Sequence, residues 1–100
     1  MSGGLAEVSR REERINVTLP VTLRSVKGGA KVVDGNTVDY SERGLRVRTN
    51  ALFRIRQDVE AIISDNSTFA RNYSVMWVRE LVQGQFLYEV GLEIQRDHFV

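Results

Sequence analysis

Hydrophobic and polar residues alternate along most of this chain, and the alternation predicts β-strands. The first such segment has a hydrophobic residue at every odd position: Ile15, Val17, Leu19, Val21 and Leu23. A strict period of two is typical of a strand that buries one face and exposes the other. Pro20 lies within this segment, and because proline has no N–H to donate, it indicates an edge position or a bulge.

Further extended segments are expected at residues 30–33, 37–40, 45–48, 58–64, 68–80 and 86–94. Asp34-Gly35, residues 65–67 and residues 83–85 are turn signals, and residues 51–57 form a connecting loop. In the long segment 68–80, Trp77 is in phase with the other apolar residues and is expected in the core. Short turns between five to six strands, with no amphipathic helix, predict a closed or nearly closed antiparallel β-barrel, which hides the sheet edges.

Composition places this barrel in a single small soluble domain. The chain has 100 residues, of which 42% are hydrophobic and 27% charged. Its apolar runs are too short for a transmembrane helix, its first residues do not form a signal peptide, and cysteine is absent, so we expect a cytosolic protein without membrane insertion. We expect residues 1–9 to form a flexible arm, 10–94 the barrel and 95–100 a tail.

Charge narrows the choice of ligand. The net charge is only +1, so binding of DNA or RNA by bulk electrostatics is not expected. The chain nevertheless has twelve arginines and only two lysines. A GC-rich genome explains this bias as well as function does, but arginine is also the residue that contacts phosphate and guanine edges in a bidentate manner.

Two short motifs carry the polar chemistry. Arg10 and Arg14 form R-x-x-x-R directly before the first strand. Asp39, Ser41 and Gly44 form D-x-S-x-x-G where the second extended part of the chain, residues 30–33 with 37–40, passes into the third at 45–48. Guanidinium groups, a carboxylate, a hydroxyl and a glycine together suit a ligand that carries both phosphates and guanine edges.

These motifs, in this order, resemble the PilZ family of bacterial cyclic di-GMP receptors. Residues 74–78 and 86–94 are similar to the later strands of that family, so the resemblance covers residues 10–94. It implies an all-β, split barrel of about six antiparallel strands that binds cyclic di-GMP without any other cofactor. It also implies a protein effector as partner, in the control of motility, exopolysaccharide or biofilm.

The resemblance implies a role for each motif residue. Arg10 and Arg14 would grip the ligand from the arm, which the ligand would order. Asp39 would accept hydrogen bonds from guanine, with Ser41 beside it, and Gly44 would provide a positive φ or a close passage of backbone past the ligand. The candidates for additional contacts are Arg11, Arg43, Arg46 and Arg71.

The chain departs from the family at two places. Many members have a second glycine where this chain has Arg43, and many have a C-terminal helix for which only residues 95–100 remain here. This helix is therefore short, missing or outside the sequence, which affects output coupling more than ligand binding.

Other interpretations stay open. The arginine arm is also explained as a solvated charged segment, and D-x-S-x-x-G as a local turn. The chain could be a PilZ-like scaffold that binds only a protein partner, or a barrel that binds single-stranded nucleic acid through its arginines. Catalytic or metal-binding sets are not recognisable, and the single histidine, His98, is near the end of the chain, so an enzyme is not expected.

Overall fold

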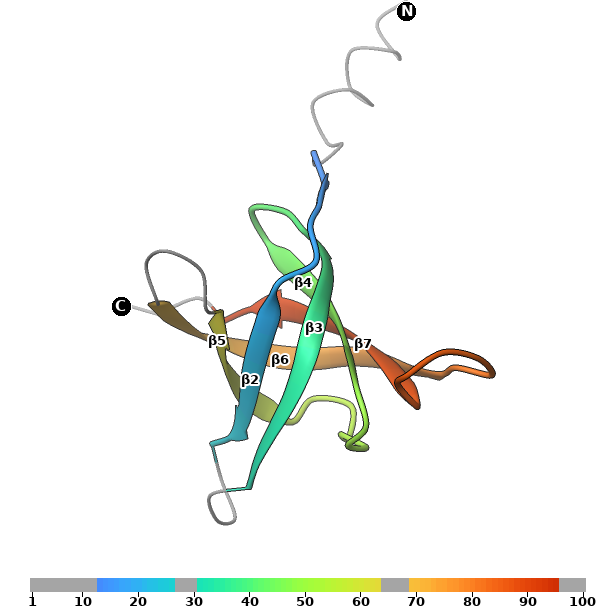
Figure 1. The fold of residues 1–100 in the computed structure, drawn as a ribbon. Coiled ribbons are helices and arrows are strands. Elements are labelled where there is room, and N and C mark those ends of the chain that lie inside the picture. Colours follow the sequence, from blue (N-terminus) through green and yellow to red (C-terminus); the bar gives the residue numbers. More distant parts are fainter. Residues whose placement is uncertain (1–12, 27–30, 64–68, 96–100) are drawn as a thin grey trace, which may run out of the picture.

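The computed structural model describes residues 13–26, 31–63 and 69–95, which form an antiparallel β-structure (Figure 1). The strands are β1 (Ile15–Asn16), β2 (Pro20–Ser25), β3 (Val32–Tyr40), β4 (Gly44–Thr49), β5 (Asp58–Ile63), β6 (Phe69–Glu80) and β7 (Tyr88–Ile94). These three ranges contain no helix, and thus none that could cross a bilayer. The expected arm, residues 1–9, and most of the expected tail lie outside the described residues.

The strands close into a barrel. Six of them pair in the ring β2-β5-β6-β7-β4-β3, which the pairing of β3 with β2 completes. The short β1 is a seventh strand that pairs with the end of β3, on the same edge of β3 as β2 and opposite β4. The predicted all-β barrel of about six strands is therefore confirmed, and closure leaves few sheet edges open.

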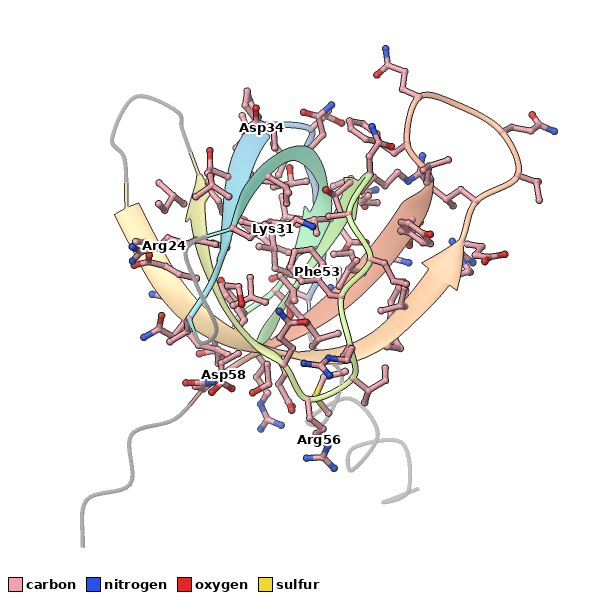
Figure 2. The ribbon with its side chains drawn as sticks, turned by 90° about the horizontal axis from the view of Figure 1, so that it is seen from below. Arg24, Lys31, Asp34, Phe53, Arg56 and Asp58 are labelled. Atoms are coloured by element: carbon pink, nitrogen blue, oxygen red, sulfur yellow. The ribbon has the colours of Figure 1, made fainter. Side chains whose placement is uncertain are left out.

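The alternating residues fill the interior as predicted. Leu45 and Val47 of β4 point inward and are buried, whereas Arg46 and Arg48 point outward. The buried apolar core comprises Val21, Leu23, Leu45, Val47, Phe53, Val59, Ala61, Tyr73, Val75, Val90 and Leu92. Seen from below, Phe53 of the β4–β5 loop lies near the centre of the ring of strands, while Arg24 and Arg56 lie at its periphery (Figure 2). The loop thus contributes a core residue that covers one end of the barrel.

One local expectation was wrong and another was met. Asp34-Gly35 is not a turn but lies within the continuous strand β3, where Gly35 pairs with both Val21 and Thr49. A Cβ on Gly35 would lie 2.3 Å from the carbonyl oxygen of Arg48, so the glycine permits close approach of two strands. Pro20 begins β2 and pairs with Asn36 of β3, whereas the pairing of β2 with β5 starts only at Val21. Pro20 is therefore unpaired on one side, in agreement with the expected edge position, and the first position of a strand tolerates the missing N–H.

Two register shifts reverse the direction of later side chains. In β3, Thr37 pairs with Val47 but Asp39 pairs with Arg46, so Val38 is an extra residue. Without this shift Asp39 would point inward like Thr37, because residues two apart in a strand share a face. The shift instead brings Asp39 beside Arg46 on the outer face.

The second shift lies in β6 and corrects another expectation. Val75 pairs with Leu92 and Trp77 pairs with Gly91, so Met76 is the extra residue. Val75 is fully buried, but Trp77 is 39% exposed and lies on the outside of the barrel. The prediction that Trp77 is a core residue was wrong because strict alternation cannot reveal a bulge.

Candidate ligand-binding site

The two register shifts gather a set of polar and aromatic residues on the outer face of four adjacent strands. Asp39 of β3, Arg46 of β4, Gly91 of β7 and Trp77 of β6 occupy one row across this face. The face is therefore built from residues that lie far apart in the sequence.

Arg14 connects the first motif to the second. Its Nη2 donates to Oδ1 of Asp39 at 2.8 Å and its Nε donates to the same oxygen at 3.1 Å, while Nη1 donates to Oγ of Ser41 at 3.3 Å. The segment that carries Arg14 is held in turn by Thr37, whose hydroxyl accepts the N–H of Leu19 at 2.8 Å and donates to the carbonyl of Val17. The buried threonine thus fixes the stretch between β1 and β2.

Asp39 also binds Arg46. Nε of Arg46 donates to Oδ2 at 3.0 Å and to Oδ1 at 3.1 Å, and Nη2 pairs with Oδ2. Asp39 is only 1% exposed, so both guanidinium groups cover its carboxylate. The hydrogen bond from Arg46 lowers the pKa of Asp39 below its ordinary value of 3.8. Burial of the carboxyl group raises this pKa, but the hydrogen bond from Arg14 lowers it as well, so the net shift is downward. Asp39 is therefore a carboxylate at neutral pH.

A second buried acid was missed in the sequence. Glu89 of β7 is 1% exposed, and its carboxylate accepts from Nη2 of Arg79 at 2.9 Å and Nε of Arg48 at 3.3 Å, with Arg46 Nη1 at 3.4 Å. Arg46 therefore bridges Asp39 and Glu89. The three arginines precede Glu89 by 10 to 43 positions, so no local motif signals this cluster. Only the register of β4, β7 and β6 brings them together.

A pocket of about 510 Å³ lies on this face, which we call the Arg14 pocket. It is lined by Arg14, Arg43, Gly44, Leu45, Arg46, Met76, Trp77, Gly91, Leu92 and Glu93. Trp77 lies directly over Gly91, because a Cβ on that glycine would be 2.2 Å from both Nε1 and Cε2 of the indole. The absence of a side chain at Gly91 thus allows the indole to pack directly on the backbone of β7. The volume is within the range of about 300–1,000 Å³ that is usual for small-molecule sites.

The other predicted residues of the second motif have defined places. The N–H of Ser41 donates to the carbonyl of Gly44 at 2.9 Å, which closes the turn from β3 into β4. Gly44 does not have a positive φ. A Cβ there would lie 2.8 Å from the carbonyl oxygen of Leu92, so its close approach is to β7. Arg43 lines the Arg14 pocket.

Arg71 lies elsewhere. It lines a separate groove with Ser41 and Tyr73 and with a set of apolar residues at the mouth of the barrel: Ile15, Val17, Leu19, Tyr40, Leu45 and Ile63. The structure does not bring Arg71 to the Arg14 pocket. Arg10 and Arg11 lie outside the described residues. Within those residues no group of three or more histidine, aspartate or glutamate side chains could hold a metal ion.

Comparison with known proteins identifies the family of this chain. The family model for the PilZ domain matches residues 9–98, nearly the whole chain. The chain belongs to the PilZ domain family. PilZ domains are receptor or adaptor domains rather than enzymes, and the arginine and D-x-S-x-x-G motifs of this member meet in space through Arg14, Asp39 and Ser41.

One solved structure to which this PilZ chain is similar is that of the Bacillus subtilis inhibitor of motility MotI/DgrA. The TM-score is 0.68 at 14% sequence identity, and the similarity covers 87% of this chain. It covers 42% of the other chain, so the PilZ chain described here corresponds to less than half of that protein. At this identity the similarity shows a shared fold. No curated protein sequence matches the chain.

Proposed function

We propose that this PilZ chain is a cytosolic receptor for cyclic di-GMP, which transmits ligand binding to a protein partner in the control of motility, exopolysaccharide or biofilm. Membership of the family supports the ligand class. The observation that carries the proposal is the direct contact of Arg14 with both Asp39 and Ser41, which joins the two motifs at one edge of a surface pocket.

Arg14 and Arg46 supply the positive charge for the ligand. The side chains of Arg14 and Arg46 are 38% and 37% exposed, and both line the Arg14 pocket, so a phosphate or a guanine edge can reach them. Guanidinium groups bind phosphate and the guanine atoms O6 and N7 with paired hydrogen bonds. Arg43 adds a third guanidinium group to the same pocket. Arg10 and Arg11, which precede Arg14 by four and three residues, would add more from the arm.

Asp39 acts first by positioning these arginines. Both of its oxygens already accept hydrogen bonds from guanidinium groups, and the carboxylate is buried beneath them. A direct contact between Asp39 and the guanine N1–H would require Arg14 or Arg46 to move toward the ligand. Because arginine orientation decides whether a bidentate contact can form, loss of Asp39 weakens binding in either case.

Trp77 provides a surface on which a guanine can stack. Its indole lies over Gly91 and lines the pocket together with Arg46 and Met76. Stacking of a base on an aromatic ring contributes about 1–3 kcal/mol, and nearby arginines add cation–π attraction. The pocket therefore combines flat apolar and cationic surfaces, which suits a flat, anionic dinucleotide.

Isothermal titration calorimetry with cyclic di-GMP tests the proposal. Arg14→Ala and Asp39→Ala are expected to weaken binding by at least about tenfold, or about 1.4 kcal/mol. Arg24→Ala is the matched control, because Arg24 is a half-exposed, ion-paired arginine that pairs with Glu60 and does not line the pocket. Absence of binding heat in the unaltered chain, or equal losses in all three variants, would reject the proposal.

One observation favours a rival. Asp39, Arg14 and Arg46 satisfy one another without any ligand, so the motifs would also persist in a scaffold that binds only a protein partner. In that case cyclic di-GMP would leave the amide chemical shifts around Asp39 unchanged, whereas the three alanine variants would still differ in stability. The two functions thus give opposite results in the same titration.

A further inference from the structure

A single acidic residue, Glu93, lies among the cations of the Arg14 pocket. Of the residues that line this pocket within the described part of the chain, three are arginines and Glu93 is the acid. A carboxylate repels phosphate, so it opposes the attraction that the arginines exert on an anionic ligand. Its position in the pocket therefore points to a part of the ligand other than the phosphates.

Strand β7 places Glu93 beside the tryptophan. Glu89, Gly91 and Glu93 are two residues apart from one another, and β7 pairs with β4 without a register shift, so all three share its outer face. Two residues of a strand span about 7 Å, so the backbone of Glu93 lies about 7 Å from that of Gly91, over which the indole of Trp77 packs. A base that stacks on Trp77 is thus within reach of the Glu93 side chain.

The two glutamates have different neighbours on the adjacent strands. Glu89 lies opposite an arginine on each side, whereas Glu93 lies opposite Gly44 of β4 and Ser74 of β6. Neither glycine nor serine has a charge to offer. Within residues 13–26, 31–63 and 69–95, the exposed side chain of Glu93 has no hydrogen-bond or ion-pair partner. Its carboxylate oxygens can therefore accept hydrogen bonds from a ligand.

Asp39 is less available for this role. It is 1% exposed, and both of its oxygens accept hydrogen bonds from the guanidinium groups of Arg14 and Arg46. A ligand could reach these oxygens only after an arginine has moved. Glu93 can accept from a ligand while the arginines stay in place.

The edge of guanine suits such an acceptor. Guanine presents two adjacent donors, N1–H and the 2-amino group, and a carboxylate only accepts hydrogen bonds. Adenine presents an acceptor at N1, which would face the carboxylate without a proton between them. An unpaired polar group of this kind, removed from water, is the strongest means by which a site rejects a close analogue of its ligand.

We propose that Glu93 selects guanine over adenine, by accepting hydrogen bonds from N1–H and the 2-amino group of a guanine that stacks on Trp77. The inference rests on the proposed function, because it names the base specificity of the same pocket. Phosphates and flat stacking faces are common to guanine and adenine dinucleotides, so the donors that Glu93 contacts distinguish the two ligands.

Calorimetry with cyclic di-GMP and cyclic di-AMP tests this role. Glu93→Gln keeps the size of the side chain but replaces one acceptor oxygen by an NH₂ donor, which suits N1 of adenine and not N1–H of guanine. The ratio of the two affinities should fall at least about tenfold. Both ligands have the same two phosphates, so the lost charge cancels in this ratio. Glu80→Gln is the matched control and should leave the ratio unchanged, because Glu80 is an exposed glutamate of β6 that does not line the pocket.

A third ligand isolates the 2-amino group. Cyclic di-IMP differs from cyclic di-GMP only in the loss of this group, and the unaltered chain should bind it at least about fivefold more weakly. The difference between these two ligands should shrink in Glu93→Gln, because the residue and the amino group form one pair in a double-mutant cycle. Thermal unfolding of each variant checks that the barrel stays folded.

Two outcomes would overturn the inference and leave the receptor function intact. The first is that Glu93→Gln changes the affinities for cyclic di-GMP and cyclic di-AMP by the same factor, because the glutamate would then act through its charge alone. The second is that the unaltered chain binds both dinucleotides equally well. If the unaltered chain bound neither, the receptor function would be rejected, and the role of Glu93 with it.

Discussion

Replacement of Asp39 by asparagine removes one charge from the centre of the site and keeps the shape of the side chain. Asp39 accepts hydrogen bonds from Arg14 and Arg46. A hydrogen bond to a charged group contributes about 1.5–3 kcal/mol and a neutral one about 0.5–1.5 kcal/mol, so Asp39→Asn would lose about 1 kcal/mol per arginine. Because both arginine side chains are more than a third exposed, solvent screening reduces the total loss to about 1–2 kcal/mol. In a domain of this size the melting temperature would fall by about 4–16 °C.

The loss depends on pH in a direction that the pKa determines. The hydrogen bonds from the arginines lower the pKa of Asp39 in the folded state below its ordinary value of 3.8. Its stabilising effect is therefore fully present above the unfolded pKa and disappears as the pH falls through the folded pKa. The difference in the free energy of unfolding between the unaltered chain and Asp39→Asn should be constant near neutral pH and shrink below about pH 3.8.

Urea denaturation of both proteins over this pH range measures the difference. Glu60→Gln is the matched control, because Glu60 also pairs with an arginine, Arg24, but its side chain is 21% exposed rather than fully buried and Arg24 is half-exposed, so the expected loss is about 0–1 kcal/mol. If Asp39→Asn were as stable as Glu60→Gln at neutral pH, or if its deficit persisted undiminished in acid, the buried carboxylate would not organise the two arginines as described.

Three further substitutions test the geometry of the barrel and of the pocket. Gly35→Ala should lower the free energy of unfolding by about 1–3 kcal/mol in urea denaturation, because its Cβ would meet the Arg48 carbonyl at 2.3 Å; a neutral effect would contradict the close approach of β3 and β4. Gly84→Ala should lower the free energy of unfolding by about 1 kcal/mol in the same assay, because its φ of 100° is unfavourable for alanine while nothing lies within 4 Å of the added Cβ. A loss as large as that of Gly35→Ala would contradict the absence of a steric clash at Gly84. Gly91→Ala should displace Trp77 and change the emission of this single tryptophan while the barrel stays folded; an unchanged spectrum would show that the indole does not lie on Gly91.

The sequence predicted the barrel because alternation is a direct consequence of strand geometry. Leu45 and Val47 are buried and Arg46 and Arg48 point outward, as their spacing indicates. Alternation failed at Trp77, because the extra residue Met76 shifts the register and reverses every later side chain. Bulges arise from pairing with another strand, so a single strand's pattern does not reveal them.

The candidate site was only partly predictable for a related reason. The motif spacing singled out Arg14, Asp39 and Ser41, which the structure brings into contact. The motif spacing did not indicate Glu89, because the alternation of β7 predicts only that this residue points outward. Its role follows from the pairing of its strand with those of Arg48 and Arg79. A rule that checks outward acids against outward arginines on adjacent strands would have found it once the register was known.

Binding of a guanine dinucleotide in the Arg14 pocket can be followed residue by residue, by NMR titration of isotope-labelled protein with cyclic di-GMP. Saturable shifts are expected at the Trp77 indole N–H and at the amides of Asp39, Ser41 and Arg43, while the amides of Val32 and Glu60, which do not line the pocket, stay in place. Unchanged spectra at millimolar ligand, or shifts confined to residues away from this pocket, would contradict it.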